Sequence, residues 1–556
     1  MSRPAIAAVV AIGAVVLAAA LVVQPVGCNQ TSHYAAVQSY SRGHAAIDHY
    51  AAETCDTAWW HGHFYSAKSP GLPLVTVPWY LLLRAAGADP PNRWLHAGYP
   101  LAMLKLDPRA VWQLGLWGVV LPFLVLLLLV RAVVERFAPG VGTPTAAILG
   151  LGTLLLPFST LFFSHVLSAC LVFAAFALLL RERPLAAGVV AGLAVVAEYP
   201  IVVVAAALGL YALRRPHHAA WYAGGAVLGL VPLALFNLWA FGSVAHLSYE
   251  DAVLVPGRSG HDVVGANTGG FFGVGAPKPR VALELLFSSK GLLTLSPVLL
   301  AACAGLVLLW RSGRRAETLL VAGTSIAVLA YASGYRYPFG GWVPGPRFLI
   351  PLLPFLAVPL GLSLRRWPLP TAALAAVSVV AMGAATSAEP LLSNQDTRHW
   401  FVRIRDGNFA ETVVSLAGGG HSWAAIVPFY ALVLAAAAAT AALLPLRPAR
   451  DGVLAAAAAL AAWALLEHAA PILLRVDRAV GKPWGALAVV ALVAALALAF
   501  ARRSPLLALP LVAFATVRFD DHTKWALGLA VLVLVALALE RPLGERLRIA
   551  GRRASA

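Results

Sequence analysis

Residues 4–24, PAIAAVVAIGAVVLAAALVVQ, form the first of many apolar runs in this chain of 556 residues. The run holds no charged side chain, and its length is close to the roughly 20 residues that a helix needs to cross a bilayer. Similar runs recur along the chain, which is 60% hydrophobic and 12% charged, with a mean hydropathy of +0.80. We therefore predict an all-α, polytopic transmembrane helical bundle of about 13–16 helices.

The predicted spans leave one long outer loop near the N-terminus and divide the chain into two parts. Residues 1–365 form the expected catalytic module, with outer loop 1 at 25–110, and residues 366–556 add further C-terminal transmembrane helices. Residues 71–87 contain two prolines and Arg84, so we expect a helix at the membrane surface there. After 4–24, the predicted spans are 111–131, 143–163, 166–181, 185–197, 200–213, 219–239, 289–310, 317–335, 346–364, 369–388, 423–445, 453–470, 485–501, 504–518 and 525–540.

The formal net charge of +17 is unevenly distributed. With the N-terminus placed in the cytoplasm, almost all of the excess arginine lies in short inner segments, such as Arg311, Arg314 and Arg315. This is the positive-inside pattern of membrane proteins, so it predicts a multi-pass plasma membrane protein with both termini cytoplasmic. It gives no support for a nucleic-acid partner.

Outer loop 1 holds the densest group of polar side chains. Residues 29–78 read NQTSHYAAVQSYSRGHAAIDHYAAETCDTAWWHGHFYSAKSPGLPLVTVP. A linker needs no such chemistry, so a reaction is expected to run against this loop. Cys28 and Cys55 flank its first half on the outer side, where a disulfide can persist, but spacing alone leaves both a bridge and two free thiols open.

Ionisable groups at membrane depth are candidates for function. The carboxylates Asp48, Asp56 and Glu198 are candidate catalytic bases, because a positioned carboxylate can remove an acceptor proton. Cations can hold a phosphate and aromatic rings can stack on a sugar. The candidate substrate-binding residues are Lys68, Arg347, Tyr65, His33, His165 and Lys290. Structural alternatives stay open: Glu198 and His165 as interfacial groups, Arg347 and Lys290 as cations that reach lipid headgroups.

Neither a resident cofactor nor a nucleotide site is predicted. His61 and His63 lie near Asp56, but no HExxH or CxxC spacing accompanies them, so a divalent metal is left open without an assigned site. A GxxxxGK[ST] phosphate loop and a GxGxxG turn opening a βαβ unit are both missing from the sequence.

The order of these motifs resembles the GT-C superfamily of membrane glycosyltransferases, which includes the protein O-mannosyltransferases and the lipid A aminoarabinose transferases. Residues 62–71, GHFYSAKSPG, resemble the loop motif G-x-x-Y-x-x-K-x-P-[GL], and the AEYP break and the segment GPRFLIPLLPF follow in order. The resemblance extends over about residues 1–365. It implies an all-helical fold, a polyprenyl-phosphate sugar donor, and Lys68 close to the donor phosphate.

One departure from this resemblance concerns the base. Where those families have an Asp-Glu pair after the first helix, this chain has Asn29-Gln30, which cannot accept a proton. The base must then come from Asp48, Asp56 or Glu198, while His165 stands about where relatives have an outer-loop acid.

Together, these residues predict an inverting hexosyl- or pentosyltransferase. It would move a sugar from a polyprenyl-phosphate donor, held with membrane lipid, to a glycan, lipid or protein acceptor on the outer face. Two alternatives remain: a transporter or flippase of lipid-linked sugars, and a non-catalytic scaffold for envelope assembly. The titratable groups gather on one face, which favours the enzyme over the transporter.

Overall fold

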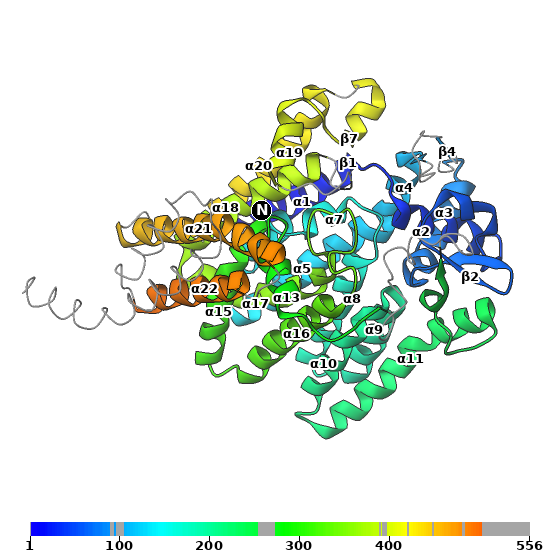
Figure 1. Cartoon of the computed structure of the whole chain (residues 1–556), viewed down its shortest axis with the longest axis horizontal. Coiled ribbons are helices and arrows are strands. Elements are labelled where there is room, and N and C mark those ends of the chain that lie inside the picture. Colours follow the sequence, from blue (N-terminus) through cyan, green and yellow to red (C-terminus); the bar gives the residue numbers. More distant parts are fainter. Residues whose placement is uncertain are drawn as a thin grey trace, which may run out of the picture.

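The computed structural model describes residues 2–88, 94–95, 105–253, 273–388, 391, 397–419, 422–446, 450–480 and 484–502. Within these ranges the backbone is mostly helical, and the strands are two to four residues long, so the predicted all-α class is confirmed. Figure 1 shows the helices packed side by side, with elements of outer loop 1 gathered at one end: α2 (Cys28–Tyr40), β2 (Thr57–Trp60) and α3 (Gly71–Ala85).

Eight helices among the described residues are long and apolar enough to cross a membrane, which makes the chain a multi-pass membrane protein. They are α1 (Arg3–Leu21), the continuous run of α4 (Pro108–Gly115), η2 (Leu116–Val120) and α5 (Leu121–Phe137), α11 (Pro216–Phe241), α16 (Arg315–Gly334), η5 (Arg347–Leu352) with α17 (Leu353–Arg366), α18 (Pro368–Ser387), α20 (Trp423–Ala442) and α21 (Arg450–Val480).

A bent pair would make a ninth span. It joins α13 (Pro279–Phe287) and α14 (Leu292–Leu295) to α15 (Val298–Arg311) at an angle of 95°. Shorter helices occupy the other predicted spans: α6 (Gly142–Gly152), α7 (Leu155–Ser159), α8 (His165–Leu180), α9 (Pro184–Ala197), η3 (Tyr199–Ile201) with α10 (Val202–Ala212), and α22 (Trp484–Arg502). The predicted spans 504–518 and 525–540 lie outside the described residues.

Two predicted spans are wrong as continuous helices: 289–310 is broken at Ser296 and Pro297, between α14 and α15, and 143–163 is broken after α6. In 143–163 the break has a local explanation. The chain leaves the helix at Thr153, whose hydroxyl donates to Leu149 O at 2.6 Å and accepts from the backbone N–H of Leu155 at 3.3 Å. Pro157 then lacks the N–H that would continue a helical ladder. The break matters because α7 and the following turn lead into His165 at the start of α8.

The bundle exposes many apolar side chains on its surface, and its interior is closely packed. Large apolar side chains are strongly exposed on α10 and α11, with Leu210 at 69%, Val227 at 67% and Leu235 at 61%. Such surfaces suit a hydrocarbon environment, in which backbone groups are satisfied within the helices. The interior contacts include α1 against α20 and α6, α15 against α17, and α5 against α8.

Helices α9 and α11 approach unusually closely through glycine. A Cβ added to Gly188 would lie 2.0 Å from the carbonyl oxygen of Tyr222, and one added to Gly229 would lie 2.1 Å from that of Val189. Small residues of this kind let transmembrane helices pack backbone against backbone. This contact fixes α9, and therefore the position of Glu198 at its C-terminal end.

Outer loop 1 is more ordered than its polarity suggests. It contains α2, η1 (Asp48–Glu53), the hairpin of β2 and β3 (His63–Ser66), and α3. Strand β2 also pairs with β6 (Ala252–Val253), which follows η4 (Ser248–Asp251), in a three-stranded antiparallel sheet of order β3-β2-β6. The expected helix at 71–87 is observed as α3, with Pro78 inside it.

Short pairings tie distant parts of the chain together. Strand β1 (Val22–Val23), directly after α1, pairs with β7 (Glu411–Thr412), and β4 (Trp94–Leu95) pairs with β5 (Lys105–Leu106). The remaining described elements are α19 (Thr397–Arg405) and η6 (Ser415–Gly419). Arg478 of α21 donates to Glu284 of α13 at 2.6 Å, so the C-terminal helices pack against the bent pair.

Candidate functional site

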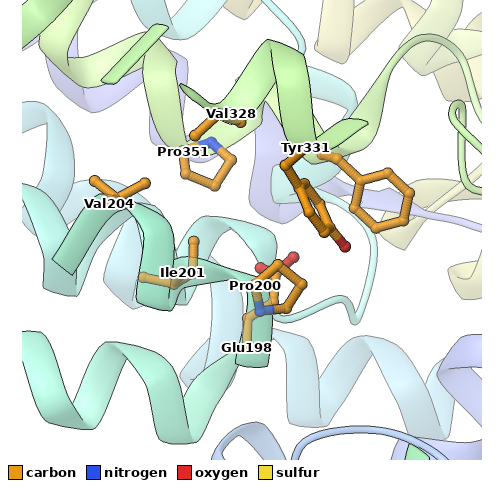
Figure 2. Close-up of a pocket in the computed structure, with 8 residues that line it drawn as sticks. Glu198, Pro200, Ile201, Val204, Val328, Tyr331 and Pro351 are labelled. Atoms are coloured by element: carbon orange, nitrogen blue, oxygen red, sulfur yellow. The ribbon is translucent and has the colours of Figure 1, made fainter. Parts of the chain in front are cut away.

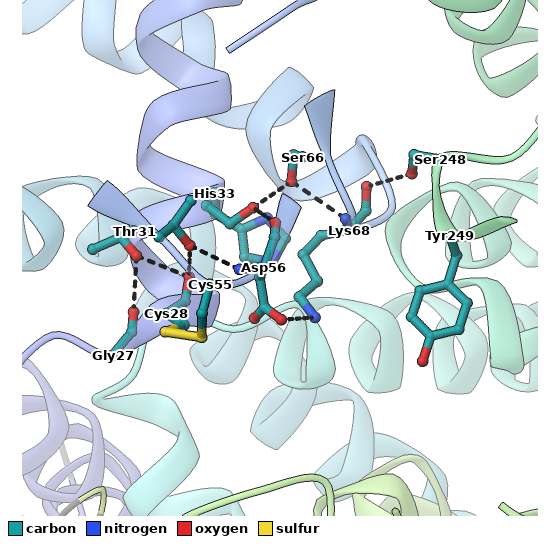
Figure 3. Close-up of polar contacts among 12 residues, drawn as sticks. Gly27, Cys28, Thr31, His33, Cys55, Asp56, Ser66, Lys68, Ser248 and Tyr249 are labelled. Carbon is teal, nitrogen blue, oxygen red and sulfur yellow. Dashed lines mark hydrogen bonds and ion pairs between the residues drawn. A yellow bond between two sulfur atoms is a disulfide. The ribbon is translucent and has the colours of Figure 1, made fainter. Parts of the chain in front are cut away.

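A disulfide and a set of serine contacts fix the middle of outer loop 1. Cys28, the first residue of α2, is bonded to Cys55, and their Cα atoms lie 5.2 Å apart. Ser32 on the next turn of α2 donates to the backbone oxygen of Asp56 at 2.7 Å and contacts the Ser66 hydroxyl, also at 2.7 Å. Figure 3 shows these contacts converging around Asp56, so α2 and the hairpin hold it from two sides.

Lys68 follows the hairpin and forms an ion pair with Asp56. The distance from its Nζ to Asp56 Oδ1 is 3.0 Å, and both side chains are largely buried. Burial lowers the pKa of Lys68 below its ordinary value of 10.5, although Asp56 and the more distant Glu198 counteract this effect. The backbone of Lys68 is held by Ser66 and by Ser248 of η4 (Figure 3).

His33 lies on the buried side of α2, beside this ion pair. It is 1% exposed, and its Nε2 atom is 3.3 Å from the hydroxyl of Ser164. Its Nδ1 atom is buried without a hydrogen-bond partner. Burial lowers the pKa of His33 to about 3, and the positive charge of Lys68 acts in the same direction. His33 is therefore neutral at physiological pH.

Glu198 and His165 form a buried pair across the ends of two helices. His165 begins α8, and Glu198 follows the last residue of α9 at the break before Pro200. The Nδ1 atom of His165 lies 2.7 Å from Glu198 Oε1, and Ser168, one turn further along α8, donates to Glu198 Oε2 at 2.7 Å. Both carboxylate oxygens are thus engaged, while Nε2 of His165 is buried without a partner.

Arg347 is the first residue of η5. Its guanidinium carbon is 5.3 Å from the ring centroid of Phe163 and 5.2 Å from that of Phe348, both within cation–π range. Its Nε atom is buried without a hydrogen-bond partner. Gly340 lies against it at a positive φ of 80°, and a Cβ there would come within 2.2 Å of that Nε, so glycine is needed for this packing.

These residues form one electrostatic group, here called the loop cluster: His33, Asp56, Lys68, His165, Glu198 and Arg347. The pKa of His33 is influenced by the charges of Lys68, Asp56, His165 and Arg347. The pKa of Lys68 is influenced by Asp56, Arg347 and Glu198. The structure therefore brings together segments that are far apart in sequence.

Two close contacts hold outer loop 1 against the helix ends. Ser69 accepts a hydrogen bond of 3.0 Å from the backbone N–H of Tyr199. A Cβ added to Gly71, at the start of α3, would lie 2.6 Å from the Cα of Ala197 at the end of α9. The segment that carries Lys68 therefore rests directly on the segment that carries Glu198.

Three other predicted site residues lie in different contacts. Asp48, the first residue of η1, is partly exposed and contacts the hairpin, where it bonds Nδ1 of His63 at 2.8 Å and accepts from the backbone N–H of Phe64 at 2.6 Å. Tyr65 is 8% exposed and packs on Phe241 in an apolar cluster. Lys290 donates to the backbone oxygen of Val343 at 3.5 Å, beside the segment that leads to Arg347.

Several contacting residues were not predicted from the sequence. Ser164 and Ser168 lie within apolar runs and do not stand out, although the i, i+3 spacing of His165 and Ser168 places them on one helix face. Phe163 and Phe348 were not predicted as site residues either, because aromatic residues are common in apolar runs. Gln30 has a structural role, because its Oε1 accepts from the backbone N–H of Phe162 at 2.9 Å and so anchors the turn before His165.

A mostly apolar pocket reaches the loop cluster from the side of α10 and α16. Figure 2 shows Glu198 beside Pro200 and Tyr331, with aliphatic side chains and Pro351 along the rest of the pocket. Its lining residues are Glu198, Pro200, Ile201, Val204, Val328, Tyr331, Phe348 and Pro351. One charged group in a mostly apolar lining suits a molecule that has both a polar and an apolar part.

No group of three or more His, Cys, Asp or Glu residues that could hold a metal ion occurs in the part of the chain that the structure describes. His61 and His63, the histidines for which a metal site was left open, make other contacts. His61 stacks on Trp60 with ring centroids 4.2 Å apart, and His63 bonds Asp48.

The apolar helices and the buried charged cluster at their ends define a multi-pass membrane protein with a buried polar site. No protein-family model and no curated protein matches the sequence. Two solved structures of ArnT from Cupriavidus metallidurans are similar to the chain. The crystal structure bound to undecaprenyl phosphate has a TM-score of 0.46 and 16% identity, and the apo structure has 0.43 and 15%. Each alignment covers 84% of this chain and 78% of the other.

Proposed function

We propose that this protein is a GT-C-type membrane glycosyltransferase that takes a sugar from a polyprenyl-phosphate donor. The observation that carries the proposal is the convergence of two cations, Lys68 and Arg347, on a buried site that also holds Asp56, Glu198 and two histidines. Cations in such a site stabilise the negative charge that develops on a phosphate leaving group.

The donor fits the surroundings of the cluster in two ways. Its phosphate would lie at Lys68 and Arg347, whose guanidinium has an unpartnered Nε atom. The apolar pocket at Glu198, between α10 and α16 (Figure 2), is too small for a polyprenyl chain, so the tail would lie outside it, along the apolar helix faces in the bilayer. A lipid-linked donor reaches the cluster through the bilayer, so the chain needs no soluble nucleotide-sugar domain.

The acceptor would approach from the side of outer loop 1. A basic side chain of the cluster would take the proton of an acceptor hydroxyl, and the hydroxyl oxygen would attack the anomeric carbon from the face opposite to the phosphate. That geometry inverts the anomeric configuration. The arginine-rich turns lie at the other helix ends, where Arg215 pairs with Glu182 at 2.8 Å, so the positive-inside rule supports a site on the outer face of the plasma membrane.

The test uses the full chain reconstituted in lipid nanodiscs. Polyprenyl-phosphate-linked radiolabelled mannose, glucose and arabinose are offered separately, with a lipid and glycan extract of bacterial envelope as the acceptor. We expect release of polyprenyl phosphate and transfer of label from one of these donors. Lys68→Met should abolish transfer, whereas Lys278→Met, which removes an exposed lysine, should leave it unchanged.

Other outcomes would overturn the proposal in distinguishable ways. Movement of labelled lipid between leaflets without cleavage of the sugar–phosphate bond would identify a flippase. Binding of polyprenyl phosphate without either reaction, under every donor, would identify a non-catalytic scaffold. Full transfer by Lys68→Met would leave glycosyl transfer in place but would remove the phosphate site from Lys68.

A further inference from the structure

The three carboxylates proposed as bases from the sequence are each engaged by a neighbour. Asp48 bonds His63 and the Phe64 N–H on the partly exposed hairpin. Asp56 forms its ion pair with Lys68 at 3.0 Å. Both oxygens of Glu198 accept hydrogen bonds, from His165 and Ser168. A carboxylate that is ion-paired, or that accepts hydrogen bonds at both oxygens, is a weak proton acceptor. The imidazoles of the loop cluster are therefore the better candidates for the base.

His165 has the arrangement of an oriented base. The carboxylate of Glu198 can only accept a hydrogen bond, so the proton of the neutral imidazole resides on Nδ1, which donates to Glu198. The other nitrogen, Nε2, then carries a lone pair. That Nε2 is buried and has no hydrogen-bond partner, although buried polar atoms are normally paired. Ser168 holds the far oxygen of Glu198, so the chain Ser168–Glu198–His165 fixes the tautomer and the direction of the ring.

His165 and Arg347 pack against the same two aromatic rings. The imidazole stacks on Phe163, with centroids 5.8 Å apart, and meets Phe348 edge to face at 6.1 Å. The guanidinium of Arg347 lies over the same two phenylalanines. Phe163 and Phe348 therefore fix the positions of the imidazole and of the proposed phosphate-binding cation relative to each other, so both groups are pre-oriented for the transfer.

We infer that Nε2 of His165 is the general base of the transfer, and that Glu198 is its positioning residue. The inference rests on the proposed function and names the atom that takes the proton of the acceptor hydroxyl. The acceptor oxygen bonds to the anomeric carbon while its proton passes to Nε2. The bond from the anomeric carbon to the phosphate oxygen breaks, and its electron pair stays on the phosphate. Glu198 stabilises the imidazolium, which then releases its proton to water.

His33 does not fill this role, although its Nδ1 is also buried without a partner. Burial lowers the pKa of His33 to about 3, and the positive charges of Lys68 and Arg347 act in the same direction. A group this reluctant to hold a proton is a poor base near neutral pH. It serves better as a neutral hydrogen-bonding group toward the substrate.

The experiment compares His165→Gln, Glu198→Gln and Ser168→Ala with the wild-type full chain in nanodiscs, using the labelled donor that the wild type accepts. We expect His165→Gln to lower kcat by about 10²–10⁴-fold while the donor KM stays close to the wild-type value. Glu198→Gln should lower kcat less and move the acid limb of the kcat/KM profile to lower pH, because the imidazolium loses its carboxylate. Exogenous imidazole should partly restore His165→Ala.

The charged and titratable groups that face the imidazole are Glu198 from the end of α9, Arg347 from η5, and Lys68 and His33 from outer loop 1. Each therefore needs its own profile, and an acid limb of kcat/KM that moves only with His33→Gln or Lys68→Arg would overturn the assignment. Folding is monitored through the thermal unfolding midpoint without ligand, and binding through the shift that undecaprenyl phosphate produces; His165→Gln should retain both.

Failure of the two proposals can be told apart. If the wild type transfers no sugar from any labelled donor, the proposed function fails. If the wild type transfers sugar and His165→Gln does so at the same rate with an unchanged acid limb, only the assignment of the base fails. Rate loss in His165→Gln together with loss of the undecaprenyl phosphate shift would also overturn it, since the residue would then act in binding.

Discussion

The ammonium group of Lys68 lies 3.0 Å from the carboxylate of Asp56, and the two side chains are only 15% and 14% exposed. The pair joins the segment after β3 to the segment held by the Cys28–Cys55 disulfide. Its partial burial raises the cost of losing either partner, because the remaining charge would be left without compensation.

Asp56→Asn should therefore destabilise the protein by up to about 3 kcal/mol, at the lower end of the range for a broken buried pair because both side chains retain some exposure. The double variant Asp56→Asn with Lys68→Met should lose less than the sum of the two single variants. The measurement is SDS-induced unfolding of the purified chain, followed by tryptophan fluorescence. Strictly additive losses would show that the two charges do not interact energetically.

Donor binding should weaken in alkaline solution at a pH below the ordinary lysine value. Burial lowers the pKa of Lys68, so its cation is present at neutral pH and is lost as pH rises through that lowered pKa. The donor KM should rise on this limb. Lys68→Arg should remove the limb, because arginine stays charged, and Asp56→Asn should shift it further down, because Asp56 acts to raise the pKa of Lys68. Identical profiles for wild type and Lys68→Arg would contradict the prediction.

His33→Gln should leave the pH profile unchanged between about pH 5 and about pH 8, where an ordinary histidine titrates. The reason is that burial lowers the pKa of His33 to about 3, so the wild-type ring is neutral throughout this interval. Glutamine keeps hydrogen-bonding capacity without titrating. Profiles of kcat/KM for the two proteins test this, and a displaced limb in the variant would show that His33 carries a proton in the cycle.

Replacing both Cys28 and Cys55 by serine should destabilise the protein by about 3.5 kcal/mol, from the loop-closure entropy of a bridge between residues 27 apart in sequence. It should also raise the donor KM, because Asp56 follows Cys55 directly. Cys170→Ala is the matched control, since that buried thiol lies in α8 and is not bridged. The measurement is the unfolding of the wild type, the double serine variant and the control under oxidising and reducing conditions. Equal stability of the wild type in both conditions would contradict the expectation.

Gly71→Ala should reduce turnover strongly, because the added methyl group would meet the backbone of Ala197 at 2.6 Å and push α3 away from α9. That displacement would separate Lys68 from Glu198. Gly323→Ala in α16 makes the same chemical change where nothing lies within 4 Å, so it should be neutral or slightly stabilising. Wild-type kcat in Gly71→Ala would show that the contact between these two helices does not position the site.

Much of the fold was predictable because helices in lipid are local structures. Apolar runs of sufficient length and the prolines that interrupt them led to α1, α11, α16, α18 and α20, and to the break at Glu198. The error at 143–163 concerns a break inside an apolar run: α6 ends before Thr153, and Pro157, four residues later, has no N–H to bond the Thr153 carbonyl. Hydropathy does not detect such a break.

The site was predicted only as a set of candidate residues. Lys68, Asp56 and Glu198 stood out because charge is rare beside a bilayer, but sequence spacing could not show which groups meet. The pairing of Glu198 with His165 spans 33 positions, and the contact of His33 with Ser164 spans 131. Asp48, equally polar in the sequence, instead pairs with His63 on the hairpin.

Hydropathy and the positive-inside rule act on local stretches, so the amino-acid sequence was enough to establish a multi-pass helical membrane protein with a polar loop after its first helix. Only the folded chain could show that Cys28 and Cys55 are bridged, that Asp56 faces Lys68, and that Glu198 holds a histidine whose other nitrogen has no partner. These are relations between distant segments, fixed by packing contacts such as Gly71 on Ala197 that leave no periodic trace in the chain.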